Sequence, residues 1–197
     1  MPFNLFLASS SPRRLELLSQ IGVPIEQVLV DVDESTVVGE SPEHYVQRLA
    51  LAKANAGWAH LEQQGRASKP VLGADTTVVF EEHILGKPRD RDDGLRMLSL
   101  LSGKTHRVLS SVAIVQGESA QTRLSCTEVS FRSLSNTEME RYWASGEPCD
   151  KAGAYGIQGF GGALVTHLNG SYTGVVGLPL AETIELLAEF GVEIWQS

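Results

Sequence analysis

The stretch Phe3-Asn4-Leu5-Phe6-Leu7-Ala8-Ser9-Ser10-Ser11-Pro12-Arg13-Arg14 places an apolar run directly before the start of a helix. The run from Phe3 to Ala8 is typical of a buried strand. Ser11 suits a helix N-cap, and Pro12 suits the first helical position. Apolar residues then recur at helical spacing, at positions 15, 18 and 21. The stretch therefore predicts a strand, a tight turn and a helix.

The start of this helix also combines the features of a phosphate-binding site. Its first N–H groups have no partner inside the helix and carry the positive end of the helix dipole. Arg13 and Arg14 add guanidinium groups, whose N–H forks match phosphate oxygens, and the hydroxyls of Ser9 to Ser11 lie beside them. A capped surface helix with two solvated arginines would show the same pattern, so the motif alone leaves both interpretations open.

Predicted strands and helices alternate along the rest of the chain. The expected strands cover residues 25–30, 71–80, 84–85, 106–115, 122–131 and 163–168, and the expected helices cover residues 42–57, 90–101, 136–145 and 179–190. Gly117 predicts a hairpin between two of the strands, Asn169-Gly170 predicts another hairpin turn, and Ser135 with Glu138 predicts a capping box. The pattern indicates an α/β protein with a mixed twisted sheet and flanking helices, in one domain spanning residues 1–197.

Composition excludes several classes of partner. The formal net charge of -8 argues against duplex DNA or an anionic membrane, while a local basic pocket could still bind a small anion. The basic residues are few and are not interleaved with aromatic residues, which argues against single-stranded RNA. Cys126 and Cys149 match no metal spacing and predict free thiols in a reducing cytoplasm, and the five histidines form no zinc-like cluster. No segment is long enough to span a bilayer.

Two acidic positions are candidates for chemistry. Asp31-Val32-Asp33-Glu34 follows the predicted strand 25–30, and ligands of open α/β sheets bind at strand ends. These carboxylates could hold Mg²⁺, although a solvated acidic turn is the alternative. Asp75 interrupts an apolar strand beside Gly73, so its carboxylate would be paired, metal-bound or catalytic. The alternative for Asp75 is a strand-end residue that caps a turn.

Two lysines could complete an anionic site. Lys53 shares a helical face with Leu49 and Ala50, so its ammonium group either extends to water or points into a cleft. Lys87 lies in a proline-stiffened loop, Gly86-Lys87-Pro88-Arg89, and could equally be solvated.

Together these residues suit hydrolysis of a phosphate anhydride. The cations would neutralise the phosphates, a metal would polarise phosphorus, and a carboxylate would accept the proton of the attacking water. The sequence contains no visible serine, cysteine or histidine triad.

Several motifs, in their order and spacing along nearly the whole chain, resemble the Maf family of nucleoside triphosphate pyrophosphatases. The matching segments are Leu7 to Arg14, Val32 to Glu34, Arg48 to Ala50 with Lys53, Gly73 to Thr76, Gly86 to Pro88, Leu101 to Gly103, Gly153 to Gly159 and Val176 to Pro179. The resemblance implies two lobes around a central cleft, as in inosine triphosphate pyrophosphatases. It also implies a cytoplasmic enzyme that depends on a divalent metal, Mg²⁺ or Mn²⁺, and cuts between the α- and β-phosphates.

The resemblance further assigns roles to individual residues. Asp75 would accept the proton and, with Glu34, hold the metal. The phosphate-binding residues would be Ser9, Arg14, Lys53 and Lys87. The family also often forms homodimers and is linked to clearance of modified nucleotides and to arrest of cell division. A nucleotide-binding regulator of septum formation, with little catalytic role, is therefore the alternative function.

Three residues resemble the branch of the family that acts on dTTP and UTP: Arg13, Thr76 and Gln158. The amide of Gln158 offers a donor and an acceptor, which can complement the N3–H group and a carbonyl of uracil or thymine. Gln158 lies in the glycine-rich stretch 153–162, which lacks the spacing of a dinucleotide-binding motif. Its glycines allow either close approach of a ligand or tight turns.

Overall fold

The computed structural model describes residues 4–195, which form one mixed sheet with helices on both faces. The strands are β1 (Leu5–Leu7), β2 (Ile25–Gln27), β3 (Val71–Phe80), β4 (His83–Leu85), β5 (Thr105–Gln116), β6 (Ser119–Phe131) and β7 (Val165–Asn169). Their order is β2-β1-β3-β5-β6-β7, and β4 pairs with β3. β1 runs parallel to β2 and β3, whereas the other pairs are antiparallel. The predicted mixed α/β sheet is confirmed; Phe3, expected at the start of its first strand, lies outside the described residues.

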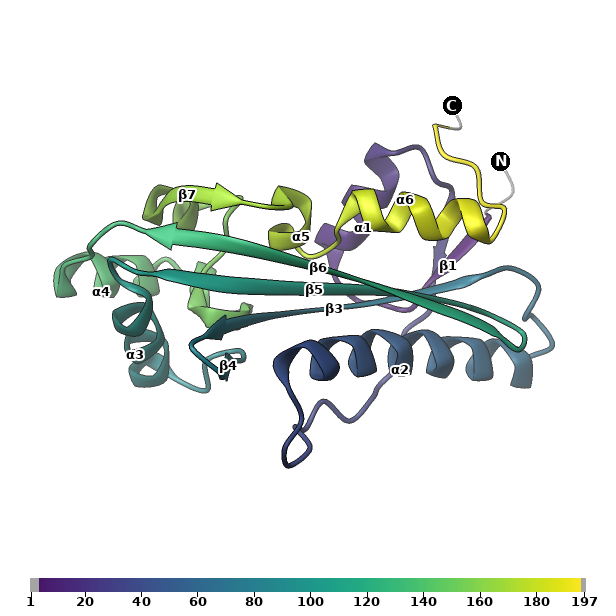
Figure 1. Ribbon diagram of the computed structural model, residues 1–197, viewed down its shortest axis with the longest axis horizontal. Helices are drawn as coiled ribbons and strands as arrows, with labels where there is room; N and C mark the ends of the chain where they lie inside the picture. The colour runs from purple at the N-terminus through teal and green to yellow at the C-terminus, as the bar shows by residue number, and fades with distance from the viewer. Residues whose placement is uncertain (1–3, 196–197) are drawn as a thin grey trace.

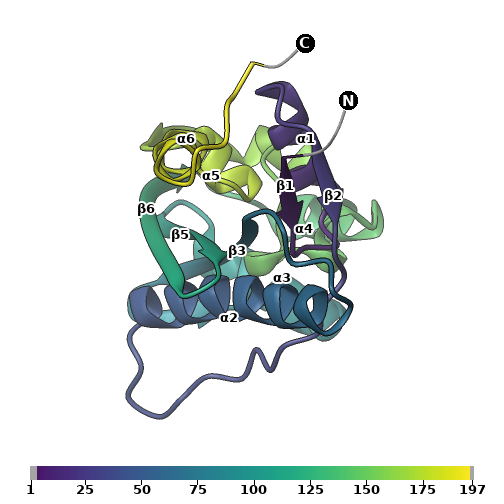
Figure 2. The same cartoon turned by 90° about the vertical axis from the view of Figure 1, so that its right-hand side faces the viewer.

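Helices cover the two faces of the sheet unequally. The α-helices are α1 (Pro12–Gln20), α2 (Pro42–Gln63), α3 (Arg91–Leu101), α4 (Asn136–Ala144), α5 (Tyr172–Val176) and α6 (Leu180–Glu189), and the 3₁₀ helices are η1 (Glu147–Asp150), η2 (Ala152–Ala154) and η3 (Phe160–Leu164). The long helix α2 lies along one face, while α1, α5 and α6 lie on the other (Figures 1 and 2). Because β3 and β5 are covered on both faces, most of their residues are buried.

Two main hydrophobic cores divide the molecule into lobes that share the long strands. One core lies between the sheet and helices α1 and α6, and includes Leu18, Leu72 and Leu186. The other lies at the opposite end of the strands, near α3 and α4, and includes Leu98 and Phe131. Helices α3 and α4 stand apart from α1 and α6 in Figure 1. This arrangement confirms the expected two-lobed architecture.

The edge of β3 is interrupted between the two lobes. β1 pairs with β3 only at Val71 and Leu72, and β4 pairs with the same strand only from Val78 onward. Within the described chain, no strand covers this edge from Gly73 to Thr77. The interruption leaves room beside the middle of β3, which is where Asp75 lies.

Several local predictions are confirmed. The strands β5 and β6 form the expected hairpin around Gly117, whose φ is +60°. Ser135 and Glu138 make both hydrogen bonds of a capping box at the start of α4. Both cysteines are free thiols. No helix within residues 4–195 combines the length and apolarity needed to cross a membrane.

Three predicted element ends are wrong by three residues or more, and one of them is the start of β6, at Ser119 rather than residue 122. The second strand ends at Gln27 rather than residue 30, although the Val28 N–H still donates to the Leu7 carbonyl. Helix α2 continues to Gln63 rather than ending near Gly57. A Cβ atom at Gly57 would lie 2.8 Å from Val71, so this glycine allows the helix to pack closely on β3 and does not terminate it.

Two predictions of turn and cap chemistry are also wrong. Asn169-Gly170 is not a hairpin turn, because the chain continues from β7 into α5, where Ser171 caps the helix by accepting from the Gly174 N–H. Ser11 occupies the N-cap position of α1, but its side chain makes no capping hydrogen bond. Its backbone N–H instead donates to Ser9 Oγ at 3.2 Å, which leaves the first turn of α1 without a side-chain cap.

Candidate active site

A cavity of about 930 Å³ occupies the interrupted edge of β3, between the two lobes. One wall comes from the β1–α1 turn, and the opposite wall comes from the loop after β4 and from residues 147–159. The lining includes all nine residues that the family resemblance picked out: Ser9, Arg13, Arg14, Glu34, Lys53, Asp75, Thr76, Lys87 and Gln158. Its volume falls in the range of small-molecule binding sites.

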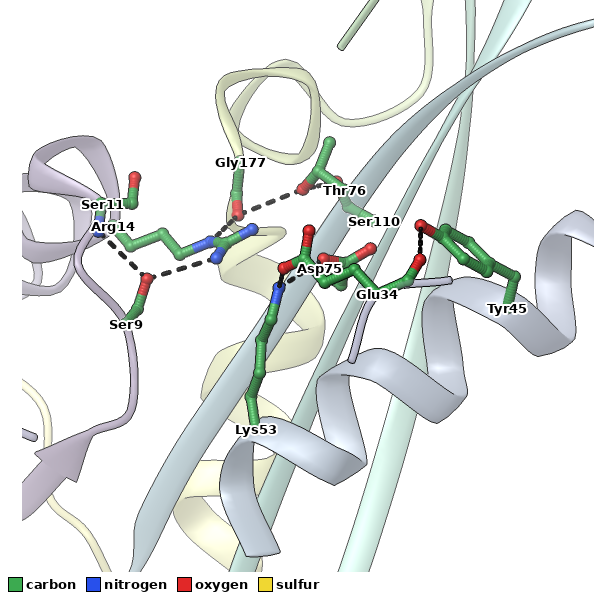
Figure 3. Close-up of polar contacts among 10 residues, drawn as sticks. All are labelled: Ser9, Ser11, Arg14, Glu34, Tyr45, Lys53, Asp75, Thr76, Ser110 and Gly177. Atoms are coloured by element: carbon green, nitrogen blue, oxygen red, sulfur yellow. Dashed lines mark hydrogen bonds and ion pairs between the residues drawn. The ribbon is translucent and has the colours of Figure 1, made fainter. Parts of the chain in front are cut away.

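Lys53 joins two carboxylates at the base of the cavity. Its Nζ atom lies 2.8 Å from Asp75 Oδ1 and 2.7 Å from Glu34 Oε1 (Figure 3). Asp75 is only 7% exposed, whereas the Glu34 side chain is 53% exposed. A lysine on α2, a strand residue and a loop residue thus converge on one point, and Lys53 does not simply extend to water.

The contact between Lys53 and Asp75 depends on Gly73. A Cβ atom at Gly73 would lie 2.4 Å from the Ala50 carbonyl oxygen and 2.5 Å from the Ala54 nitrogen, both backbone atoms of α2. The helix can therefore lie against β3 only where the strand has no side chain. This close approach brings the same turn of α2, which carries Lys53 between Ala50 and Ala54, to Asp75 two residues along the strand.

Asp75 lies in the interior of its strand and does not cap a turn. It sits in the middle of β3, in register with Ser111 of β5. Burial raises the pKa of the Asp75 carboxyl above its ordinary value, against the opposing charges of Lys53 and Arg14. The alternative of a turn-capping residue at the end of the strand is therefore wrong.

The pKa of Glu34 shifts in the other direction. Burial raises it, but the hydrogen bond and charge of Lys53, with a further contribution from Lys87, lower it more, so the net shift is downward. Two neighbouring carboxyl groups whose environments shift their pKa values apart are suited to different tasks.

Arg14 connects the helix start to a distant segment. Its Nε donates to the Gly177 carbonyl at 2.9 Å, and its Nη1 donates to Ser9 Oγ at 3.2 Å. Burial lowers the pKa of Arg14, yet a guanidinium group stays charged in proteins. The serine hydroxyl and the arginine, which the sequence singled out as phosphate ligands, therefore contact each other.

The family model described as Maf-like protein matches residues 4–190. The chain belongs to the Maf family. It is 52% identical to the dTTP/UTP pyrophosphatase of Chromobacterium violaceum, over 97% of this chain and 96% of that protein. It is 55% identical to the dTTP/UTP pyrophosphatase of Saccharophagus degradans, over 98% of this chain and 92% of that protein.

The fold of this Maf chain is shared with a more distant protein. The solved structure of the Staphylococcus aureus Ham1 protein aligns with a TM-score of 0.53 over 95% of this chain and 97% of that one. The two sequences are 14% identical, so the likeness concerns the fold alone.

Three further candidate residues of the Maf chain have free polar ends. The side chains of Arg13, Lys87 and Gln158 make no hydrogen bond or ion pair with any other residue within the range 4–195. All three line the cavity, so their N–H and amide groups can meet a ligand.

Thr76 lies on the opposite face of β3 from Asp75, because successive strand residues point to opposite faces. Its hydroxyl lies 2.8 Å from Ser110 Oγ and 3.4 Å from the Gly177 carbonyl oxygen (Figure 3). Ser110 in turn donates to the Gly174 carbonyl. Thr76 therefore ties β3 to the α5 segment, in addition to lining the cavity.

No role was predicted from the sequence for the two residues that hold the loop around Glu34, although Arg48 lies in one of the matching segments. The Tyr45 hydroxyl donates to the Glu34 carbonyl at 3.0 Å, and Arg48 Nη2 donates to the Ser35 carbonyl at 3.0 Å. Burial, with the charges of Asp75 and Glu34, raises the pKa of Tyr45 to about 12. Tyr45 and Arg48 lie three residues apart and are therefore neighbours on the surface of α2, and this spacing is the signal that could have identified them as a pair.

The donor set at the cavity suits a hard divalent cation. Among the described residues, no group of three or more histidine, cysteine, aspartate or glutamate side chains could hold a metal ion by itself. Glu34 and Asp75 together offer two carboxylates, both within contact of Lys53. Mg²⁺ is commonly held by one or two carboxylates, with substrate phosphates and water completing its shell. The residues therefore fit Mg²⁺ or Mn²⁺ bound together with a phosphate ligand.

Proposed function

We propose that this chain hydrolyses nucleoside triphosphates, with dTTP and UTP preferred, to the nucleoside monophosphate and pyrophosphate. The observation that carries the proposal is the cavity itself, whose lining brings Arg13, Arg14, Lys53 and Lys87 together with the buried Asp75. The two relatives that are 52% and 55% identical over nearly the whole chain are dTTP/UTP pyrophosphatases, which supports the choice of substrate.

In this mechanism the cations bind the triphosphate. Arg13, Arg14 and Lys87 neutralise its oxygens, and Ser9 adds a hydroxyl donor beside Arg14. A divalent cation held by Glu34 and Asp75 supplies charge neutralisation at the phosphates when it is bound. Because separate segments of the chain supply these groups, both lobes contact the bound triphosphate.

Asp75 acts as the general base. It accepts a proton from a water molecule whose oxygen attacks the α-phosphorus, and the bond from that phosphorus to the bridging oxygen breaks, releasing pyrophosphate. Lys53, at 2.8 Å from Asp75, orients the carboxylate. The amide of Gln158 pairs with the N3–H group and a carbonyl of the pyrimidine.

The test is incubation of the purified protein with Mg²⁺ or Mn²⁺ and a panel of nucleoside triphosphates. We expect pyrophosphate as the product, with dTTP and UTP giving the highest kcat/KM. Direct release of orthophosphate, or no turnover of any pyrimidine triphosphate, would reject the proposal.

The resemblance to the family also supports a homodimer in the cytoplasm, and sedimentation velocity tests its oligomeric state. Roles in clearing modified nucleotides and in arrest of cell division remain predictions. Overproduction of a catalytically inactive variant separates division arrest from catalysis.

A further inference from the structure

The glycine-rich loop 156–161 is wrapped around a single carboxylate. Glu147 Oε2 accepts the Phe160 N–H at 2.8 Å, and Glu147 Oε1 accepts the Gly161 N–H at 2.9 Å. Earlier in the same loop, Ile157 and Gln158 line the cavity. One acidic side chain therefore holds the C-terminal end of the segment that presents Gln158.

Tyr142 of α4 holds the other end of the same loop. Its hydroxyl accepts the Gly156 N–H at 3.0 Å and donates to Glu147 Oε1 at 2.8 Å. Gly156 and Gly161 are thus linked through a tyrosine hydroxyl and a carboxylate. The two side chains form one connected hydrogen-bond network that closes the loop.

The glycines of this loop leave no space for other side chains. A Cβ atom at Gly159 would lie 2.1 Å from Glu147 Oε2, and one at Gly161 would lie 2.5 Å from Tyr142 Oη. The glycines therefore serve the close fit of the loop around Glu147 and Tyr142. At these two positions the glycines therefore allow close approach of side chains of the protein itself.

The environment of Glu147 favours the ionised form of its carboxyl group. Burial raises the pKa of Glu147, but the Gly161 and Phe160 N–H groups and the Tyr142 hydroxyl lower it more, so that the net shift is downward. An ionised carboxylate accepts hydrogen bonds more strongly than a neutral one. The Lys151 ammonium group also donates to the Glu147 carbonyl at 2.7 Å, which fixes the backbone of η1.

We propose that Glu147 and Tyr142 are positioning residues that determine nucleobase selectivity by holding the loop that presents Gln158. This inference rests on the proposed function and adds two residues to it. The groups assigned to the triphosphate come from other segments, so the network should affect recognition of the base and leave binding of the phosphates unchanged.

The test compares Glu147→Gln and Tyr142→Phe with the wild-type protein. The amide of Glu147→Gln turns a donor toward backbone N–H groups, and Tyr142→Phe keeps the packed ring while removing the hydroxyl. Glu140→Gln is the matched control, because it removes an exposed carboxylate of α4 whose ion pair is with Arg91. Thermal unfolding verifies that each variant is folded. If Glu147→Gln does not fold, Tyr142→Phe tests the inference on its own.

We expect KM for UTP to rise by about tenfold in either variant, because a hydrogen bond to a charged group is lost. The preference for UTP over purine triphosphates should fall, UMP should bind more weakly, and the Kd of pyrophosphate should be unchanged. Unchanged selectivity, or equal weakening of UMP and pyrophosphate binding, would overturn the inference. Absence of hydrolysis by the wild-type protein would instead reject the proposed function, so the two failures are distinguishable.

Discussion

Arg14 and Gly177 lie 163 positions apart in the chain, yet the arginine Nε donates to the glycine carbonyl at 2.9 Å (Figure 3). The φ of Gly177 is +136°, a conformation that side-chain-bearing residues rarely adopt. The bond holds the guanidinium group at the edge of the cavity, and the N–H groups not donated to Gly177 or Ser9 are left for a ligand.

Arg14→Lys should weaken substrate binding although it preserves the charge. A lysine ammonium group cannot reproduce the planar fork that contacts both Gly177 and Ser9. We expect KM for the triphosphate to rise by about 10- to 100-fold, which corresponds to the loss of charged hydrogen bonds. Steady-state kinetics measure the effect, and Arg91→Lys, at an exposed position, is the control. An unchanged KM would show that Arg14 does not bind the substrate.

Asp75→Asn should reduce turnover far more than binding. The amide keeps the shape of the side chain but cannot accept the proton of water, and loss of a general base typically costs about 10²- to 10⁴-fold in rate. Substrate affinity, measured separately by calorimetry, should remain close to the wild-type value. Asp92→Asn, at an exposed position of α3, controls for the change of charge. Activity near the wild-type level would exclude Asp75 as the base.

Removal of divalent cations with a chelator should abolish hydrolysis, and added Mg²⁺ should restore it. Glu34→Gln should raise the Mg²⁺ concentration needed for half-maximal activity, because one of two carboxylates is neutralised. Binding of Mn²⁺ in the presence of nucleotide, followed by electron paramagnetic resonance, provides a readout independent of turnover. Full activity in the chelator would contradict the metal assignment.

Gly73→Ala should destabilise the fold and separate Lys53 from Asp75. The new methyl group meets backbone atoms of α2, which cannot move aside individually, and overpacking of this kind typically costs about 1–3 kcal/mol. Urea unfolding measures the loss. The matched control is Gly86→Ala, where a Cβ atom would meet nothing within 4 Å. Equal stability of the two variants would show that α2 tolerates the methyl group.

His106 should make the stability of the protein depend on pH. It is 2% exposed, its Nε2 lies 2.8 Å from the Tyr155 hydroxyl, and burial lowers its pKa to about 4. In the unfolded chain the histidine protonates near pH 6.5. Its stabilisation is therefore complete above pH 6.5 and is lost as the pH falls toward 4, by on the order of 3 kcal/mol.

Urea unfolding between pH 7 and pH 4 tests this expectation. His106→Gln retains a polar partner for Tyr155 but cannot titrate, so its stability should change less over this range. His83→Gln, at an exposed position of β4, should behave as the wild-type protein does. Parallel pH profiles for all three proteins would contradict the assignment.

Patterns between near neighbours in the sequence determined much of the fold. The capping box at Ser135 and Glu138 and the hairpin at Gly117 involve residues a few positions apart, and local chemistry decides them. Asn169-Gly170 shows the limit of prediction from local patterns, because the segment that follows packs as a helix on β6 and forms no second strand. Gly57 shows the same limit, since its role is a contact with β3.

The sequence by itself determined which residue types the candidate site contains, because a buried aspartate, a serine-proline-arginine turn and two lysines are visible as local anomalies. Only the tertiary structure decided how they meet. Lys53 reaches Asp75 because Gly73 lets a helix lie against a strand, and Arg14 reaches Gly177 across almost the whole chain. Tyr45, Tyr142 and Glu147 act through hydrogen bonds to the backbone of distant or looped segments, and such contacts follow from packing rather than from any local pattern.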